Sequence, residues 1–202
     1  MHITDIRPRR KGLSALYLDG EYAVSLDTQT LLEHRINTGC ELSDEDLREL
    51  IEMSSERRAK EKALWLISYR DHSKKELKDK LVRTCDADAA DKAVARMEEL
   101  GLVNDDKFAR QYARRLLLEK KLTRRAAAFE LTRKGIDRET AEKVLGEIDV
   151  DYRGNIREII EKKYRNVQDE KEKRRAVAAL QRLGYGWDDI KAVLEEYTDT
   201  DY

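Results

Sequence analysis

The chain has 202 residues, of which 41% are charged, yet its net charge is only −1. Nine glycines and one proline are too few for the many tight turns of an all-β domain, and the balanced charges with periodic apolar residues exclude a disordered chain. The composition predicts a mainly α-helical protein whose helices bury narrow apolar stripes.

The N-terminal segment predicts a small β-structure. Leu13–Leu18 and Glu21–Leu26 flank Asp19-Gly20, a dipeptide that suits a type I′ turn. Ile3 and Ile6 predict a third short strand. With a two-residue turn, six side chains would share one inward face. The expected cross-strand pairs are Tyr17 with Tyr22, Ala15 with Val24 and Leu13 with Leu26.

Two helices are expected next. Thr28–Ile36 predicts a short helix, with Gly39 ending it. Ser43 is a predicted N-cap for a second helix. Its predicted apolar stripe is Leu47, Leu50 and Ile51.

From about residue 57 the whole chain has helical periodicity, beginning with the stripe of Ala59, Ala63, Leu66 and Ile67. Ser73 and Glu76 form a capping box, and Gly101 is a predicted helix end. Further helix starts are expected at Asp88, at Asn104, Asp105 and Asp106, at Thr123 and at Asp137. Residues expected to face inward include Ala90, Ala93, Met97 and Leu100, and in the last helix Trp187, Ile190 and Leu194.

These helices repeat. Leu131 through Gly135 match Leu180 through Gly184 at an offset of 49 residues, and Leu81 through Cys85 form a weaker copy. The pattern predicts three tandem three-helix repeats over residues 57–103, 104–150 and 151–199, after an N-terminal extension over 1–56. Because one repeat alone has too little core, the repeats are expected to stack into an elongated, curved array.

The sequence contains no catalytic constellation. His2, His34 and His72 are scattered, and Cys40 and Cys85 suit two free thiols in a reducing compartment. There is no phosphate-binding glycine-rich loop and no Cys-x-x-Cys motif. We therefore expect a cytoplasmic, monomeric protein that is not an enzyme, binds no cofactor or metal and does not enter a membrane.

Basic residues gather in the middle of the chain. Residues 105–135 hold ten basic and four acidic residues, whereas residues 185–202 hold one basic and six acidic residues. This segment is either a solvated face or a surface for an acidic partner or nucleic acid. The candidate binding residues are Lys107, Arg110, Arg114, Arg115, Lys120, Lys121, Arg124, Arg125 and Arg133.

The stretch from Leu100 to Tyr112, followed by Thr123 to Ile136, resembles the RecX family of regulatory proteins, as do the three tandem repeats. Two features depart from the family pattern. The turn Lys120–Thr123 lacks the glycine that the family usually has there, and Cys85 replaces the glycine found in the other two repeats.

The resemblance implies a protein that binds RecA filaments and restrains strand exchange and coprotease activity, and some family members also bind single- or double-stranded DNA weakly. A curved helical array would suit the groove of such a filament, because several weak contacts add up. Two other functions remain open from the residues themselves. They are a direct nucleic-acid-binding module and a helical-repeat scaffold for another partner.

Overall fold

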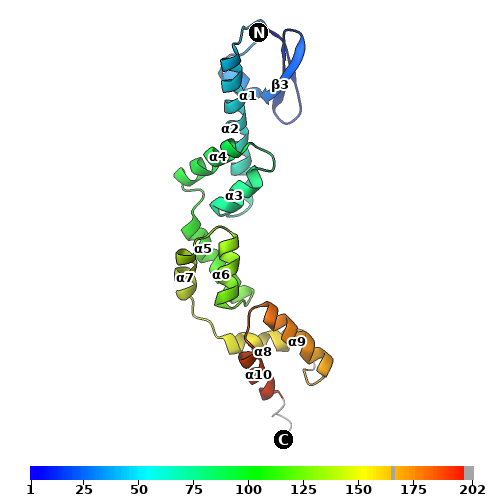
Figure 1. The fold of residues 1–202 in the computed structure, drawn as a ribbon, viewed down its shortest axis with the longest axis vertical. Helices are drawn as coiled ribbons and strands as arrows, with labels where there is room; N and C mark the ends of the chain where they lie inside the picture. Colours follow the sequence, from blue (N-terminus) through cyan, green and yellow to red (C-terminus); the bar gives the residue numbers. More distant parts are fainter. Residues whose placement is uncertain (165–166, 198–202) are drawn as a thin grey trace. The chain divides into compact units, whose positions relative to one another are not determined.

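Three antiparallel strands begin the chain in the spatial order β1 (Ile3–Pro8), β2 (Leu13–Leu18) and β3 (Glu21–Asp27) (Figure 1). The structure is a computed structural model that describes residues 1–164 and 167–197. The chain divides into two compact units, residues 1–104 and the part from residue 105 onward, and each unit is described by itself.

The register of the sheet differs from the predicted one. Tyr17 lies opposite Tyr22 as expected, and Asp19 and Gly20 both have positive φ, as a type I′ turn requires. A bulge between Leu16 and Tyr17 then shifts the pairing by one residue. The predictions for two pairs were therefore wrong: Ala15 faces Ser25 instead of Val24, and Leu13 faces Asp27 instead of Leu26.

The inward face of β2 is not the one that carries Tyr17. Leu16 and Leu18 enter the core of the sheet, whereas Tyr22 is 55% exposed. The expectation of a single inward face containing both tyrosines was wrong, because Leu16 and Leu18, which alternate with Tyr17 along β2, are the side chains that pack inward.

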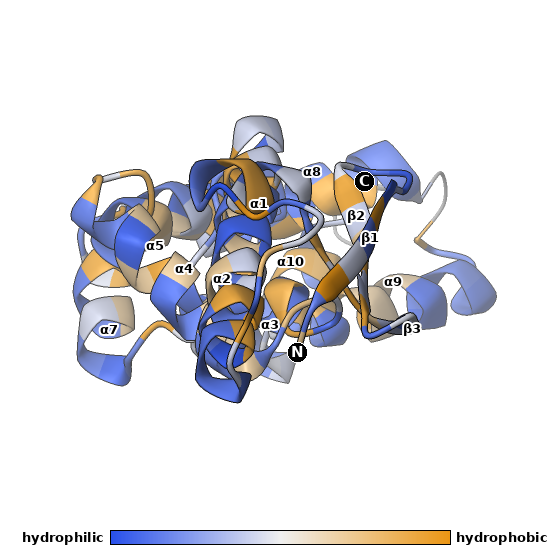
Figure 2. Ribbon diagram, turned by 90° about the horizontal axis from the view of Figure 1, so that it is seen from above, coloured by the Kyte–Doolittle hydropathy of each residue, from blue (hydrophilic) through white to orange (hydrophobic). Residues whose placement is uncertain are grey.

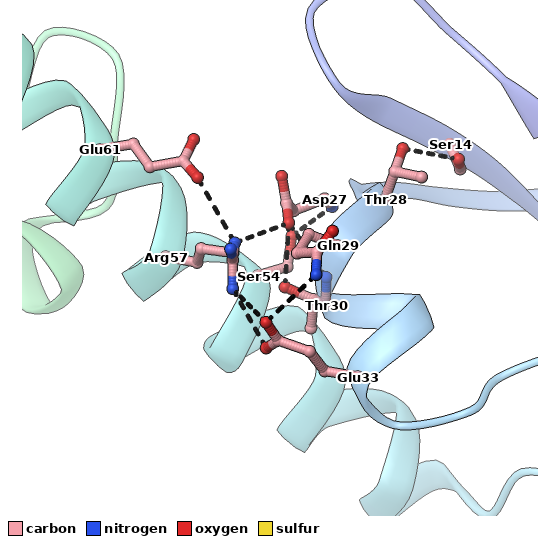
Figure 3. A network of polar contacts seen from close by, with 9 residues as sticks. All are labelled: Ser14, Asp27, Thr28, Gln29, Thr30, Glu33, Ser54, Arg57 and Glu61. Carbon is pink, nitrogen blue, oxygen red and sulfur yellow. Dashed lines mark hydrogen bonds and ion pairs between the residues drawn. The ribbon is translucent and has the colours of Figure 1, made fainter.

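A polar network joins the sheet to the helices that follow it (Figure 3). Asp27 is buried and caps α1 (Thr28–Glu33) by accepting from the Thr30 backbone N–H at 3.0 Å. The Asp27 backbone N–H donates to Ser54 Oγ at 2.7 Å. Arg57 donates to both carboxylate oxygens of Glu33 at 2.9 and 3.1 Å and lies 3.2 Å from the Asp27 carboxylate.

Helix α2 (Asp44–Tyr69) begins at the predicted cap Ser43, which forms a complete capping box with Asp46. The boundary expected between residues 56 and 57 falls inside this helix. Its first half packs Leu50 against the sheet, and its second half packs Ala59 and Ala63 against the first repeat.

The first repeat combines the end of α2 with α3 (Lys74–Leu81) and α4 (Ala87–Glu99). Helix α4 begins at Ala87, one residue before the predicted start at Asp88. Ala90, Ala93 and Met97 are buried as predicted, but Leu100 is 49% exposed because the helix has already ended beside it.

The second unit holds the other two repeats. One contains α5 (Asp105–Arg114), the π-helical turn η1 (Arg115–Glu119), α6 (Arg124–Arg133) and α7 (Arg138–Gly146). The other contains α8 (Tyr152–Lys163), α9 (Glu170–Arg182) and α10 (Trp187–Glu196). Each repeat has its own apolar cluster.

Gly135 and Gly184 lie just beyond the ends of α6 and α9. Both residues have positive φ, and the next residue donates its backbone N–H to the carbonyl five residues earlier. Cys85 occupies the corresponding position in the first repeat without a positive φ. Helix α3 therefore ends without a left-handed residue.

Single helices carry apolar residues beside polar ones, which Figure 2 shows as neighbouring orange and blue segments. In α10, Ile190 and Leu194 are buried as predicted, but Trp187 is 52% exposed. The prediction for Trp187 was wrong because it occupies the first helical position, where the side chain lies outside the packed turns. In the described ranges, no helix is long and apolar enough to cross a bilayer.

Candidate functional site: the basic surface of the second repeat

The basic residues of α5 lie on the solvent side of their helix. Lys107, Arg110 and Arg114 are exposed, whereas Phe108 and Leu116 are buried. This separation is the one that the helical spacing predicts. The three cations therefore belong to a solvent-facing surface.

Two of the candidate arginines meet at the C-terminal end of α7. Arg110 forms an ion pair with Glu147, and Arg124 donates to the backbone carbonyls of Leu145 at 3.2 Å and Ile148 at 2.8 Å. Carbonyls at a helix C-terminus lack partners within the helix and carry partial negative charge. Arg124 therefore stabilises the end of α7.

Lys121 lies in the junction between the second and third repeats. Its φ is +55°, so a lysine takes the left-handed conformation at the turn where the family pattern has a glycine. Its ammonium group donates to Asn155 Oδ1 at 2.9 Å and pairs with Glu158, both on α8. The side chain is only 18% exposed. These contacts tie the turn to the next repeat.

The contact with Lys121 changes the pKa of the Glu158 carboxyl group. Lys121, and after it Lys162, lowers the pKa of Glu158 from 4.5 to about 2 by donating to its carboxylate. Glu158 is consequently held ionised at the junction.

Two tyrosines complete the junction. The Tyr185 hydroxyl donates to the Lys121 carbonyl at 2.8 Å, and the Arg124 backbone N–H donates to the Tyr152 hydroxyl at 3.2 Å. The two rings meet edge to face at 6.2 Å. Burial raises the pKa of Tyr185 to about 12, so its hydroxyl stays protonated and able to donate.

The backbones of the two repeats also approach closely. The Thr123 N–H donates to the Leu183 carbonyl at 3.0 Å. A Cβ added at Gly184 would lie 2.3 Å from Thr123 Oγ1, and Gly184 has a φ of +98°. Glycine is therefore required at residue 184 for two reasons, the backbone conformation and the space available.

The nine candidate residues thus have different surroundings. Lys121 and Arg124 make the contacts inside the second unit described above. Arg115 lies 3.9 Å from Glu119, and Arg133 lies 3.1 Å from Glu130, within their own helices. Arg114, Lys120 and Arg125 are exposed and form no ion pair in the described part of the chain. These last three are the cations most available to a partner.

A groove between α6 and α7 adds residues that the sequence did not single out. It has a volume of about 530 Å³, and its apolar lining includes Ala128, Ala141 and Leu145. Phe129, 68% exposed, lies at the groove with Arg125 and Arg138. Phe129 sits two residues from buried Ala127 and Leu131, on the polar side of α6. That position was the available signal, since an aromatic side chain on a polar face has no core role.

No group of three or more His, Cys, Asp or Glu side chains in the described ranges is arranged to hold a metal ion. Cys40 and Cys85 are half-buried free thiols. His72 is buried, and its burial lowers the pKa of its imidazole, which hydrogen-bonds the Arg70 carbonyl at 2.8 Å. The His72 side chain is therefore part of the packed interior.

Comparison with known proteins assigns the three repeats. Residues 59–97, 104–145 and 151–194 match the first, second and third three-helix domains of RecX, respectively. The chain is 31% identical over 170 residues to the regulatory protein RecX of Caldanaerobacter subterraneus subsp. tengcongensis, covering 81% of this chain and 84% of that protein.

Two further comparisons extend over most of the chain. The regulatory protein RecX of Clostridioides difficile is 26% identical over 190 residues, covering 92% of this chain and 90% of that protein. A crystal structure of a regulatory protein RecX superposes with a TM-score of 0.62 at 18% identity, covering 96% of this chain and 98% of the other. The matched domains, their order and their three-helix composition agree with the observed fold, and the chain belongs to the RecX family of regulatory proteins.

Proposed function

We propose that this protein binds RecA filaments, with or without DNA, and restrains their recombinase and coprotease activities. The observation that carries the proposal is the match of all three repeats to the RecX domains, in order. RecA is the recombinase that this family is known to regulate. The proposal needs only a binding surface.

The surface that best suits this role lies on the second repeat. Arg125 lies beside the apolar groove between α6 and α7, where Arg138 pairs with the lining residue Glu142 at 2.7 Å. Arginine pairs with carboxylates through two parallel hydrogen bonds, and an apolar groove takes an aliphatic or aromatic side chain. This combination fits an acidic segment of a RecA protomer that carries an apolar anchor.

Arg114 and Lys120 extend the positive surface beyond the groove. An exposed ion pair contributes roughly 0–1 kcal/mol, so several are needed for useful affinity. A filament supplies many copies of the same partner, and contacts made to neighbouring protomers add through their high effective concentration.

The test is a titration of this protein into RecA bound to single-stranded DNA, with the DNA-dependent ATPase rate as the readout. We expect the rate to fall in a saturable manner, and cleavage of a RecA-dependent coprotease substrate to fall over the same range. A rise in both rates would show that the protein activates RecA and does not restrain it. No change in either rate, together with no co-sedimentation with filaments, would refute the proposal and favour a scaffold for another partner.

A further inference from the structure

The loop between β1 and β2 concentrates positive charge outside the three RecX domains. Arg7, Arg9, Arg10 and Lys11 are four cations within five residues, interrupted only by Pro8. Arg7 pairs with Asp5 at 2.6 Å. Arg9, Arg10 and Lys11 are exposed and form no ion pair with any residue of the described ranges. Because the whole chain carries a net charge of −1, this positive region is a local feature.

The backbone holds this loop in place. Lys11 and Gly12 have φ values of +61° and +67°, which turn the chain back toward β2. The Arg9 N–H donates to the Leu13 carbonyl at 2.7 Å, and the Thr28 N–H donates to the Gly12 carbonyl at 2.8 Å. The cations therefore project from a fixed end of the sheet.

An aromatic pair lies on the same sheet. The rings of Tyr17 and Tyr22 are 6.0 Å apart at 75°, and the Arg7 guanidinium lies 4.5 Å from the Tyr17 ring centroid. Tyr22 is 55% exposed. Leu16 and Leu18, in contrast, pack into the apolar cluster of the sheet. The two tyrosines thus lie on the side of β2 and β3 that faces away from this cluster, with Arg7 of β1 over the Tyr17 ring.

The geometry points to a binding site for single-stranded nucleic acid that runs along the sheet from the β1–β2 loop to Tyr22. Arg9 and Arg10 line one hollow with Ser25, and the Tyr22 hydroxyl lies 3.2 Å from Ser25 Oγ. Arg9, Arg10 and Lys11 would contact phosphates, and Tyr22 would stack on a base. Phosphates attract clustered cations, and base stacking on aromatic rings requires a base that is not already stacked within a duplex. An acidic protein segment would use the cations but gain little from exposed rings, so an unpaired strand is the occupant that uses both features.

This site is separate from the surface proposed for RecA. Arg9, Arg10 and Tyr22 lie in the first unit, whereas Arg125 and the α6–α7 groove lie in the second. Experiments without RecA can therefore test this inference, and their outcome does not depend on whether the protein regulates filaments.

The test measures binding of the full-length protein to a fluorescent oligothymidylate by anisotropy. The charge variant is Arg9→Glu with Arg10→Glu. Its matched control is Lys171→Glu with Arg182→Glu, which changes the net charge equally at two exposed cations of the third repeat. We expect the charge variant to lose at least about tenfold in affinity and the control to lose much less. The slope of log K against log salt should become shallower by about 1.4, as expected for two lost phosphate contacts.

A second pair of variants tests the aromatic contact. Tyr22→Ala should weaken binding to oligothymidylate by about tenfold, and Tyr22→Phe should retain binding because it keeps the ring. With an abasic oligonucleotide, which keeps its phosphates but has no bases, the parent and Tyr22→Ala should bind equally. Circular dichroism and the melting temperature of each variant verify that the sheet is intact.

Three results would overturn the inference. Equal losses in the charge variant and its control would show that only overall charge matters. Tighter binding of the parent to duplex than to single-stranded DNA would exclude stacking as the basis of recognition. Unchanged DNA affinity in the charge variant, with loss of binding to an acidic polypeptide such as polyglutamate, would assign the loop to a protein partner.

Discussion

The Tyr185 hydroxyl lies 2.8 Å from the backbone carbonyl of Lys121, so a side chain of the third repeat satisfies a turn of the second. Removing the hydroxyl leaves that carbonyl without this donor, which costs about 1 kcal/mol. We expect Tyr185→Phe to lower the free energy of unfolding in urea by about that amount. Tyr69→Phe, at a ring that is 71% exposed, should have almost no effect.

The same tyrosine predicts a pH dependence. Its pKa rises from 10.0 to about 12 on folding, so between these values the folded protein binds more protons than the unfolded chain. The Tyr185 contribution to stability is therefore fully present below about pH 10 and is lost as the pH rises toward about 12. The difference in unfolding free energy between the parent and Tyr185→Phe should shrink over that interval. A constant difference would show that the ring is not buried in solution.

Gly184 tests the close approach of the two repeats. Gly184→Ala forces alanine into a left-handed backbone and places its Cβ 2.3 Å from Thr123 Oγ1. Gly101→Ala is the control, because it has a φ of +68° and nothing within 4 Å. The left-handed backbone should lower the free energy of unfolding of both variants by about 1 kcal/mol. The steric clash should lower that of Gly184→Ala by at least about 1 kcal/mol more. Equal losses in thermal or urea unfolding would mean that the two repeats can separate there.

Helix α10 carries one fully buried and one exposed apolar side chain, and their substitutions should differ in effect. Ile190 is fully buried, whereas Trp187 is 52% exposed. Ile190→Ala should lower the free energy of unfolding by about 2–5 kcal/mol, and Trp187→Ala by less than about 0.5 kcal/mol. Urea unfolding of both variants, followed by circular dichroism, measures the contrast. A larger loss for Trp187→Ala would place the tryptophan in a packed interface.

Glu158 predicts an acid-sensitive contact. Its pKa is lowered from 4.5 to about 2 in the folded protein, so its stabilising effect is present above about pH 4.5 and is lost as the pH falls toward about 2. The parent should exceed Glu158→Gln in stability near neutral pH, and the gap should close over that acidic interval. Glu52→Gln, at an exposed residue, is the control. A gap that persists at low pH would mean that the contact does not depend on charge.

The basic surface predicts two separable effects. Arg114→Glu with Arg125→Glu should weaken filament binding at least about tenfold, or ~1.4 kcal/mol, with little change in melting temperature. Arg124→Glu should lower the melting temperature, because it removes the donors to the Leu145 and Ile148 carbonyls. Lys171→Glu with Arg182→Glu controls for net charge. Filament binding that survives in the Arg114 and Arg125 variant would move the recognition surface to another repeat.

Local signals in the sequence predicted the helix ends well. Ser73, Thr123 and Asp137 are N-caps whose side chains accept from the backbone three residues later, and Gly101 follows the end of α4 with a positive φ. Each of these features depends on residues within one helical turn, so the sequence displays it directly.

The features that the sequence did not reveal depend on distant partners. Lys121 is one of several basic residues in a row, and its role comes from Asn155 and Glu158 on another repeat. The bulge beside Leu16 is a feature of the pairing of β2 with β3, which neither strand's own sequence displays. The continuity of α2 was hidden because Leu50 and Ala59 are nine residues apart, which at ~100° per residue places them on opposite sides of one helix.

That continuous helix has a consequence for how the first unit unfolds. Helix α2 contributes Leu50 to the core of the sheet and Ala63 to the core of the first repeat. Unfolding of either half would break the hydrogen bonds that span the middle of α2 and would leave the other half with an uncapped end. The amides of both halves should therefore exchange with deuterium in one concerted opening. A fragment starting at residue 59, where the first RecX domain match begins, would lack the Ser43 cap and should lose cooperative unfolding.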